Sequence, residues 1–184
     1  MTSIFKKSLL VAAVALTSNA SLGFVSSASA QSITDGYFRL TTQFREGHNE
    51  CLEGNQRNGS MNGAAFMDTC QNVSGQMWKA TPLGDDYYKL TTQFREGHNE
   101  CLEGNQRNGS MNGAAFMDTC QNVTGQMWKS IPLGDGYYKL VTQFREGEGE
   151  CLEGNQRNGS MNGAAFMDAC QNVTGQMWKA IPVN

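Results

Sequence analysis

A unit of about fifty residues occurs three times in this 184-residue chain, and the repetition constrains the fold more than any other feature. The units span 35–84, 85–134 and 135–184 and follow one another without gaps. The first two differ at six positions and the last two at eight. An open stack of repeats needs end units with a changed, polar outer face. Units this similar indicate a closed ring, in which each unit has two neighbours.

Within a unit, four short segments alternate with segments rich in Gly and Asn, and the first and last of the four are rich in aromatic and β-branched residues. In the second unit the short segments are 87–94, 101–103, 114–120 and 126–133. This pattern is typical of strands joined by turns, and Asn-Gly pairs at 108–109 and 112–113 suit tight hairpins. We expect four strands per unit and no substantial helix. Propellers close with about four to eight blades, so three such units predict an all-β chain with a β-trefoil fold.

The N-terminus has the composition of a secretory signal peptide. Lys6 and Lys7 precede a short apolar run, 8–16, and Ala-Ser-Ala at 28–30 provides a cleavage site. The run falls short of the roughly 20 residues that span a bilayer. We therefore expect residues 1–30 to be removed and 31–184 to form one secreted domain, extracellular or periplasmic.

The remaining chain is acidic. The signal segment contains two of the 14 Lys and Arg and none of the 17 Asp and Glu, so 12 basic and 17 acidic residues remain and the net charge is −5. Nucleic acids and anionic membranes both favour clustered basic residues. We expect neither as a partner, no membrane insertion, and a monomer.

All six cysteines lie within the repeats, where export favours disulfides, and none forms a Cys-x-x-Cys pair. Two symmetric pairings are open. One joins the two cysteines of each unit. The other joins neighbouring units in a ring, as Cys70–Cys101, Cys120–Cys151 and Cys170–Cys51.

The Gln-Met-Trp triplets at 76–78, 126–128 and 176–178 resemble the Gln-x-Trp signature of ricin B-type lectins, and Cys51-Leu52-Glu53 resembles that family's Cys-Leu-Asp strand. The resemblance covers the whole chain after the signal segment. It implies a β-trefoil fold with shallow sugar pockets, one per unit at most. It also implies disulfides within units: Cys51–Cys70, Cys101–Cys120 and Cys151–Cys170.

The family's pocket uses an Asp, an aromatic platform, an Asn and the Gln, and the matching positions here are Glu53, Asp68, Gly75 and Gln76. Asp68 removes the apolar face on which a sugar ring would stack at that position. Asn55 belongs to a polar segment, 53–63, that is identical in all units. The predicted ligand-binding residues are Glu53, Asn55, Asp68, Gln76, Glu103, Asn105, Asp118, Gln126, Glu153, Asn155, Asp168 and Gln176.

The leading hypothesis is a carbohydrate-binding module with up to three equivalent weak sites. The alternative is a structural or protein-binding trefoil, such as an inhibitor or matrix component. Paired carboxylates such as Glu53 and Asp68 also serve glycoside hydrolysis and calcium binding, but no apolar pocket is evident that would raise the pKa of an acid. We expect no enzymatic activity, no cofactor and no metal. Because Glu148 stands where His48 and His98 occur, a symmetric three-histidine centre is excluded.

Disulfide mapping separates the two pairings, provided that it uses the third unit, whose peptides are unique. Non-reducing tryptic digestion should link peptide 146–157 to peptide 158–179, as measured by mass spectrometry. A link from 146–157 to peptide 108–129, which contains Cys120, would show pairing between units.

Overall fold

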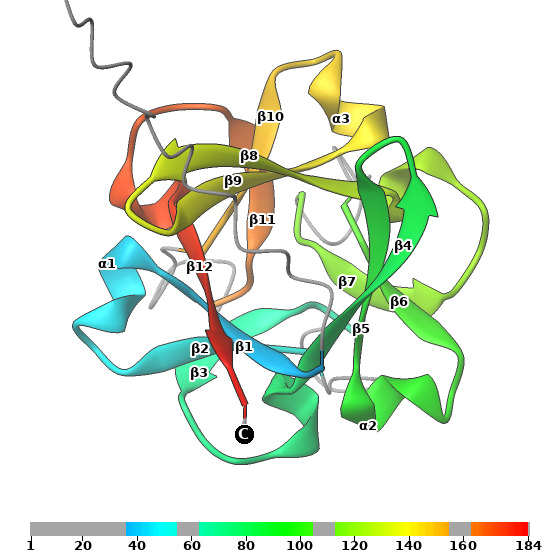
Figure 1. The fold of residues 1–184 in the computed structure, drawn as a ribbon, viewed down its shortest axis with the longest axis horizontal. Helices are drawn as coiled ribbons and strands as arrows, with labels where there is room; N and C mark the ends of the chain where they lie inside the picture. The colour runs from blue at the N-terminus through cyan, green and yellow to red at the C-terminus, as the bar shows by residue number, and fades with distance from the viewer. Residues whose placement is uncertain (1–35, 55–62, 105–112, 155–162, 184) are drawn as a thin grey trace, which may run out of the picture.

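The computed structural model describes residues 36–54, 63–104, 113–154 and 163–183, so the predicted signal segment lies outside the described residues. The units share one order of elements (Figure 1). The first has β1 (Phe38–Thr42), α1 (Gln43–Glu46), β2 (Glu50–Glu53), β3 (Phe66–Thr69), the 3₁₀ helix η1 (Ser74–Gln76) and β4 (Trp78–Gly84). The second has β5 (Tyr87–Thr92), α2 (Gln93–Glu96), β6 (Glu100–Glu103), β7 (Phe116–Thr119), η2 (Thr124–Gln126) and β8 (Trp128–Gly134). The third has β9 (Tyr137–Thr142), α3 (Gln143–Glu146), β10 (Glu150–Glu153), β11 (Phe166–Ala169), η3 (Thr174–Gln176) and β12 (Trp178–Pro182).

Six strands close into a barrel in the order β1-β12-β9-β8-β5-β4, and the other six form the hairpins β2–β3, β6–β7 and β10–β11. The hairpins meet through a cycle of backbone hydrogen bonds. The amide of Ala65 donates to the carbonyl of Ala115, Ala115 to Ala165, and Ala165 back to Ala65, each at 2.8 Å. Figure 1 shows the resulting threefold arrangement, with α1, α2 and α3 at three corners. The fold is a β-trefoil with four strands per unit, as the sequence predicted.

The first strand of each unit is shorter than the apolar pattern suggested. β5 ends at Thr92, whose hydroxyl accepts the backbone N–H of Arg95 at 3.3 Å and begins the single turn α2. Threonine favours this capping position. Arg95 is buried and pairs with Glu100 at 2.9 Å, whereas Phe94, expected to continue the strand, is 44% exposed. The cap therefore overrides the apolar pattern and turns Phe94 outward.

The tryptophans of the Gln-Met-Trp triplets belong to the hydrophobic core. Trp78, Trp128 and Trp178 are fully buried. The indole N–H of Trp78 donates to the carbonyl of Leu52 at 2.7 Å, so the buried polar group is satisfied. A Cβ at Gly54 would lie 2.8 Å from Cη2 of Trp78, which requires glycine there.

The same side-chain contacts occur at all three junctions between units. At the first, Tyr37 and Lys79 both bond the carboxylate of Glu96, at 2.7 and 3.0 Å, and the Lys79 ammonium lies 5.9 Å from the Tyr37 ring centroid. The corresponding groups at the other junctions are Tyr87, Lys129 and Glu146, then Tyr137, Lys179 and Glu46. Because the last set joins the third unit to the first, the ring closes with the contacts used inside the chain.

The disulfides are Cys51–Cys70, Cys101–Cys120 and Cys151–Cys170, each with a Cα–Cα distance of 4.9 Å. The pairing within units, which the lectin resemblance implied, is confirmed. Each bond closes a loop of about 20 residues, for which the chain-entropy argument gives roughly 3 kcal/mol. In the part of the chain that the structure describes, no helix has the length and apolar character needed to span a membrane.

The close approach of Trp128 to Gly104 gives a stability prediction. A Cβ at Gly104 would lie 2.8 Å from Trp128 Cη2 and 2.9 Å from Met167 Sδ. We expect Gly104→Ala to lower the free energy of unfolding by about 1–3 kcal/mol through overpacking, measured by denaturant titration.

Gly97→Ala is the matched control. Gly97 has an ordinary helical φ of −66°, and nothing lies within 4 Å of the position that its Cβ would take. This variant should keep or slightly exceed wild-type stability. Equal losses in the two variants would contradict the packing argument.

Candidate functional site

Each hairpin has an outward face that brings acidic and aromatic side chains together. In the first unit β2 pairs with β3 so that Cys51 lies opposite Asp68 and Glu53 opposite Phe66. Directly opposed residues share a face of a sheet, and residues two apart along a strand do as well. Glu53, Phe66 and Asp68 therefore share one face. Leu52 lies on the opposite face of the hairpin and packs in the hydrophobic core.

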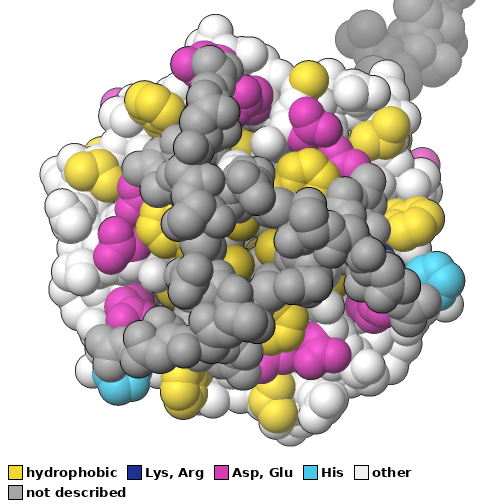
Figure 2. All heavy atoms as spheres, turned by 180° about the vertical axis from the view of Figure 1, so that it is seen from behind, with side chains coloured by type: hydrophobic (Ala, Val, Ile, Leu, Met, Phe, Trp, Pro, Cys, Tyr) yellow, Lys and Arg dark blue, Asp and Glu magenta, His cyan; other side chains and the backbone are white. Residues whose placement is uncertain are grey.

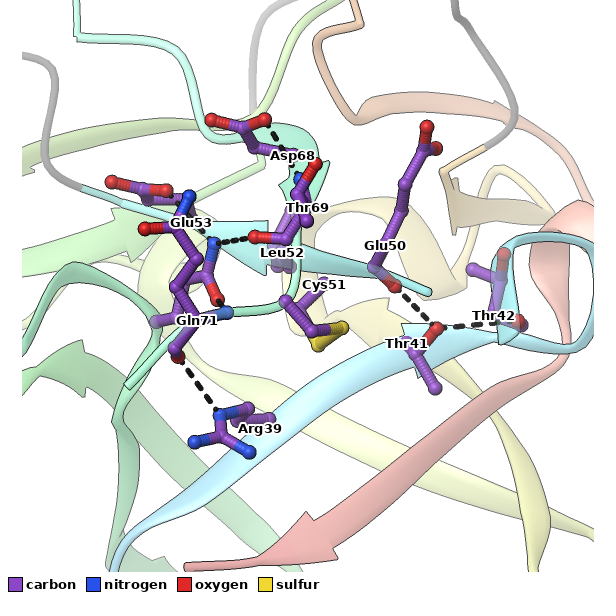
Figure 3. The surroundings of a disulfide bond; sticks show 12 residues. Arg39, Thr41, Thr42, Glu50, Cys51, Leu52, Glu53, Asp68, Thr69 and Gln71 are labelled. Atoms are coloured by element: carbon purple, nitrogen blue, oxygen red, sulfur yellow. Dashed lines mark hydrogen bonds between the residues drawn. A yellow bond between two sulfur atoms is a disulfide. The ribbon is translucent and has the colours of Figure 1, made fainter. Parts of the chain in front are cut away.

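Glu53 is 6% exposed and is held by a neighbour from η1. The Nε2 group of Gln76 donates to its Oε2 atom at 2.9 Å. The same pair occurs in the other units at 2.9 Å, as Gln126 with Glu103 and Gln176 with Glu153. Figure 3 shows the carboxyl groups of Glu53 and Asp68 on neighbouring strands of the hairpin that the disulfide of Cys51 closes.

Gln76 is fully buried, and its amide is occupied by the protein. Besides Glu53, Nε2 donates to the carbonyl of Thr69 at 2.9 Å, and Oε1 accepts the backbone N–H of Gln71 at 2.7 Å. Both amide hydrogens are thus used within the unit. The sequence predicted Gln76 among the ligand-binding residues. The structure places it behind Glu53, where it can act by orienting that carboxylate.

The environment of Glu53 changes its acidity. Burial raises the pKa of Glu53, the hydrogen bond from Gln76 lowers it, and the negative charge of Asp68 raises it, with a net upward shift. Asp68 is exposed, and its Oδ1 accepts the backbone N–H of Thr69 at 2.7 Å. Glu53 therefore takes up a proton at a higher pH than an ordinary glutamate does.

Phe66 is a candidate site residue that the sequence reasoning missed. The lectin resemblance places the aromatic platform two residues before the second cysteine, where Asp68 stands, whereas Phe66 lies four residues before it. Phe66 is half-buried, opposite Glu53 on one side and bridged to Ala164 of the third unit on the other. The period of two along β3 was the available signal, since it puts Phe66 and Asp68 on one face.

The other units repeat this arrangement. Glu103 and Glu153 are each 5% exposed, and Asp118 and Asp168 are exposed. Their phenylalanines are Phe116 and Phe166, opposite Glu103 and Glu153. The predicted residues Asn55, Asn105 and Asn155 lie outside the described residues.

The charge of the site is negative. Figure 2 shows Asp and Glu side chains recurring around one face of the molecule, with almost no Lys or Arg visible there. Among the described residues, no group of three or more His, Cys, Asp or Glu is arranged to hold a metal ion. The arrangement offers hydrogen-bond acceptors beside an aromatic ring, which suits a neutral ligand rich in hydroxyl groups.

The sequence matches no protein-family model and no curated protein. The structure is similar to that of the designed 3-fold symmetric protein ThreeFoil, at 23% identity over 81% of this chain and 100% of that one, with a TM-score of 0.63. It is also similar to SeviL bound to asialo-GM1 saccharide, at 13% identity over 82% and 100% with a TM-score of 0.57. An exo-β-1,3-galactanase from Clostridium thermocellum matches at 21% identity over 80% of this chain and 30% of its own, with a TM-score of 0.61. Identities this low show the shared fold alone.

The proximity of Asp68 gives a pKa prediction. We expect Asp68→Asn to lower the pKa of Glu53, because the variant removes a negative charge that disfavours the ionised form. Carboxyl carbon shifts followed by NMR during a pH titration would measure it. Asp118→Asn is the control, since it makes the same change in the second unit and should leave Glu53 unaltered. An unchanged Glu53 in the first variant would show that the two carboxylates do not interact.

Proposed function

We propose that this protein is a secreted, lectin-like carbohydrate-binding module with three equivalent sites. One observation carries the proposal. In each unit a buried glutamate, fixed by a buried glutamine, lies opposite a half-buried phenylalanine and shares a face with an exposed aspartate. In the first unit these residues are Glu53, Gln76, Phe66 and Asp68.

The chemistry of the face fits a sugar. Ionised carboxylates accept hydrogen bonds from hydroxyl groups, and the ring of Phe66 provides apolar surface for the C–H groups of a pyranose. The acids disfavour sugars that carry carboxylate or sulfate. Because the ricin B-type resemblance implies shallow pockets, we expect a dissociation constant on the order of a millimolar for one site. Three sites on a polymer can raise the avidity by roughly 10² to 10⁴.

Other findings agree with the proposal. SeviL, a structure of the same fold, is bound to the asialo-GM1 saccharide. The Gln-x-Trp and Cys-Leu-Glu sequences resemble ricin B-type lectins, although the fold alone hosts many functions. Three disulfides suit an oxidising compartment, which supports removal of residues 1–30 on export and an extracellular or periplasmic domain.

Protein binding is the second candidate, and exposed aromatic side chains favour it. Phe44, Phe94 and Phe144 at the three corners are 43%, 44% and 47% exposed. Exposed aromatic residues are common anchors of protein interfaces. Under this alternative, Phe94→Ser would abolish partner binding and no glycan would bind.

Glu103→Gln tests the sugar-binding proposal. The variant keeps the size of the side chain and an oxygen that accepts the Gln126 hydrogen bond, but it removes the carboxylate charge. After a glycan array has identified a ligand, calorimetric titration with its monovalent form should give two sites per chain in place of three. Retention on the immobilised polymer should fall more steeply, because avidity depends on the number of sites.

Asp86→Asn is the control for charge. Asp86 lies in the exposed turn between β4 and β5, with a φ of 65° that asparagine tolerates, and this variant should keep three sites. Three sites in Glu103→Gln would remove Glu103 from the binding face. Binding of no glycan by the wild type would reject the proposed function.

A further inference from the structure

We infer that each sugar-binding face is positioned by the next unit in the ring, through a buried threonine that bonds the residue following the site glutamate. Thr92 of the second unit is the positioning residue for Glu53 of the first. This inference rests on the proposed function, and it adds that no unit forms its binding face alone.

The contact lies at Gly54, directly after Glu53. The Thr92 hydroxyl donates to the Gly54 carbonyl at 3.2 Å, and Nε of Arg95 approaches the same oxygen at 3.4 Å. The amide of Gly54 donates to the carbonyl of Gly75, within its own unit, at 2.8 Å. The peptide that follows Glu53 is therefore held from one side by its own unit and from the other by the next.

Packing holds the same peptide from both units. A Cβ at Gly54 would lie 2.8 Å from Trp78 Cη2, in the first unit, and 2.9 Å from Met117 Sδ, in the second. Gly54 and Thr92 are both buried. Because water does not reach this contact, a lost hydroxyl bond is not replaced by solvent, and the backbone after Glu53 must relax.

The same threonine-to-carbonyl hydrogen bond occurs at the other two junctions between units. Thr142 donates to the carbonyl of Gly104 at 3.3 Å, after Glu103. Thr42 donates to the carbonyl of Gly154 at 3.4 Å, after Glu153, so the site of the third unit depends on the first. Each site is thus assigned to a threonine of the next unit in the ring, and the assignment is directional.

Thr92→Val removes the hydroxyl and keeps the branched shape, whereas Thr92→Ser keeps the hydroxyl. Titration of the full chain with the monovalent glycan should give two sites for Thr92→Val, with unchanged affinity at both, and three for Thr92→Ser. If the Thr92 hydroxyl contributed only to the stability of the fold, every variant that folds would still bind at three sites.

Double variants show which site is lost. Thr92→Val with Glu53→Gln should still bind at two sites, since both changes affect the first unit's site. Thr92→Val with Glu103→Gln should bind at one. The reverse pattern, one site and then two, would assign Thr92 to its own unit and overturn the inference, as would three sites in Thr92→Val alone.

A measurement without ligand separates this inference from the proposed function. By NMR, Thr92→Val should shift the pKa of Glu53 and leave that of Glu103 unchanged, even if the wild type binds no glycan. An unaltered Glu53 would overturn the positioning role. If Thr92→Val does not fold, Thr142→Val makes the equivalent test, with Glu103 as the responding residue.

Discussion

The carbonyl groups of Gly54, Gly104 and Gly154 lie where the core of each unit meets its neighbour, and the packing of the structure depends on this contact. Each of these glycines contacts a fully buried tryptophan of its own unit and a methionine of the next, so a side chain would separate the two. Threonine hydroxyls from the next unit bond the carbonyls. The core, the barrel and the junctions therefore form together, and a single unit would leave tryptophan surface and peptide groups unsatisfied.

Because the units depend on one another in this way, the hydrophobic side chains of all three units pack into one core. Around the barrel, each strand pairs with one strand of its own unit and one strand of a neighbouring unit. β12 pairs with β1 in the register used between β8 and β9, with Trp178 opposite Thr42 as Trp128 is opposite Thr142. The first and last strands, β1 and β12, therefore pair with each other in the same way as the internal strands β8 and β9. Closure then adds no new kind of contact, only a third copy of one that the chain already makes twice.

Equivalent junctions also produce equivalent binding faces. The register of the β2–β3 hairpin places Glu53, Phe66 and Asp68 on one face, and the Gln76 amide orients the Glu53 carboxylate. Under the proposed function, three weak sites at a rigid spacing would let one polymer engage more than one of them, which raises the avidity. Under the proposed function, the acidic side chains at these faces would disfavour anionic sugars.

The repeat, the strand count and the trefoil architecture followed from the sequence, because a ring without caps and four short strands per unit leave few alternatives. Glu53 and Asp68 were also predicted from the sequence as ligand-binding residues, through the lectin resemblance, and the strand register places both on one face of the hairpin. Tertiary structure decided the rest. It buried Gln76 behind Glu53, since the η1 turn directs that amide inward, and it brought Phe66 opposite Glu53 through a strand register that no local pattern specifies. It also joined Thr42 to Gly154, a contact between the first and third units that depends on closure of the ring.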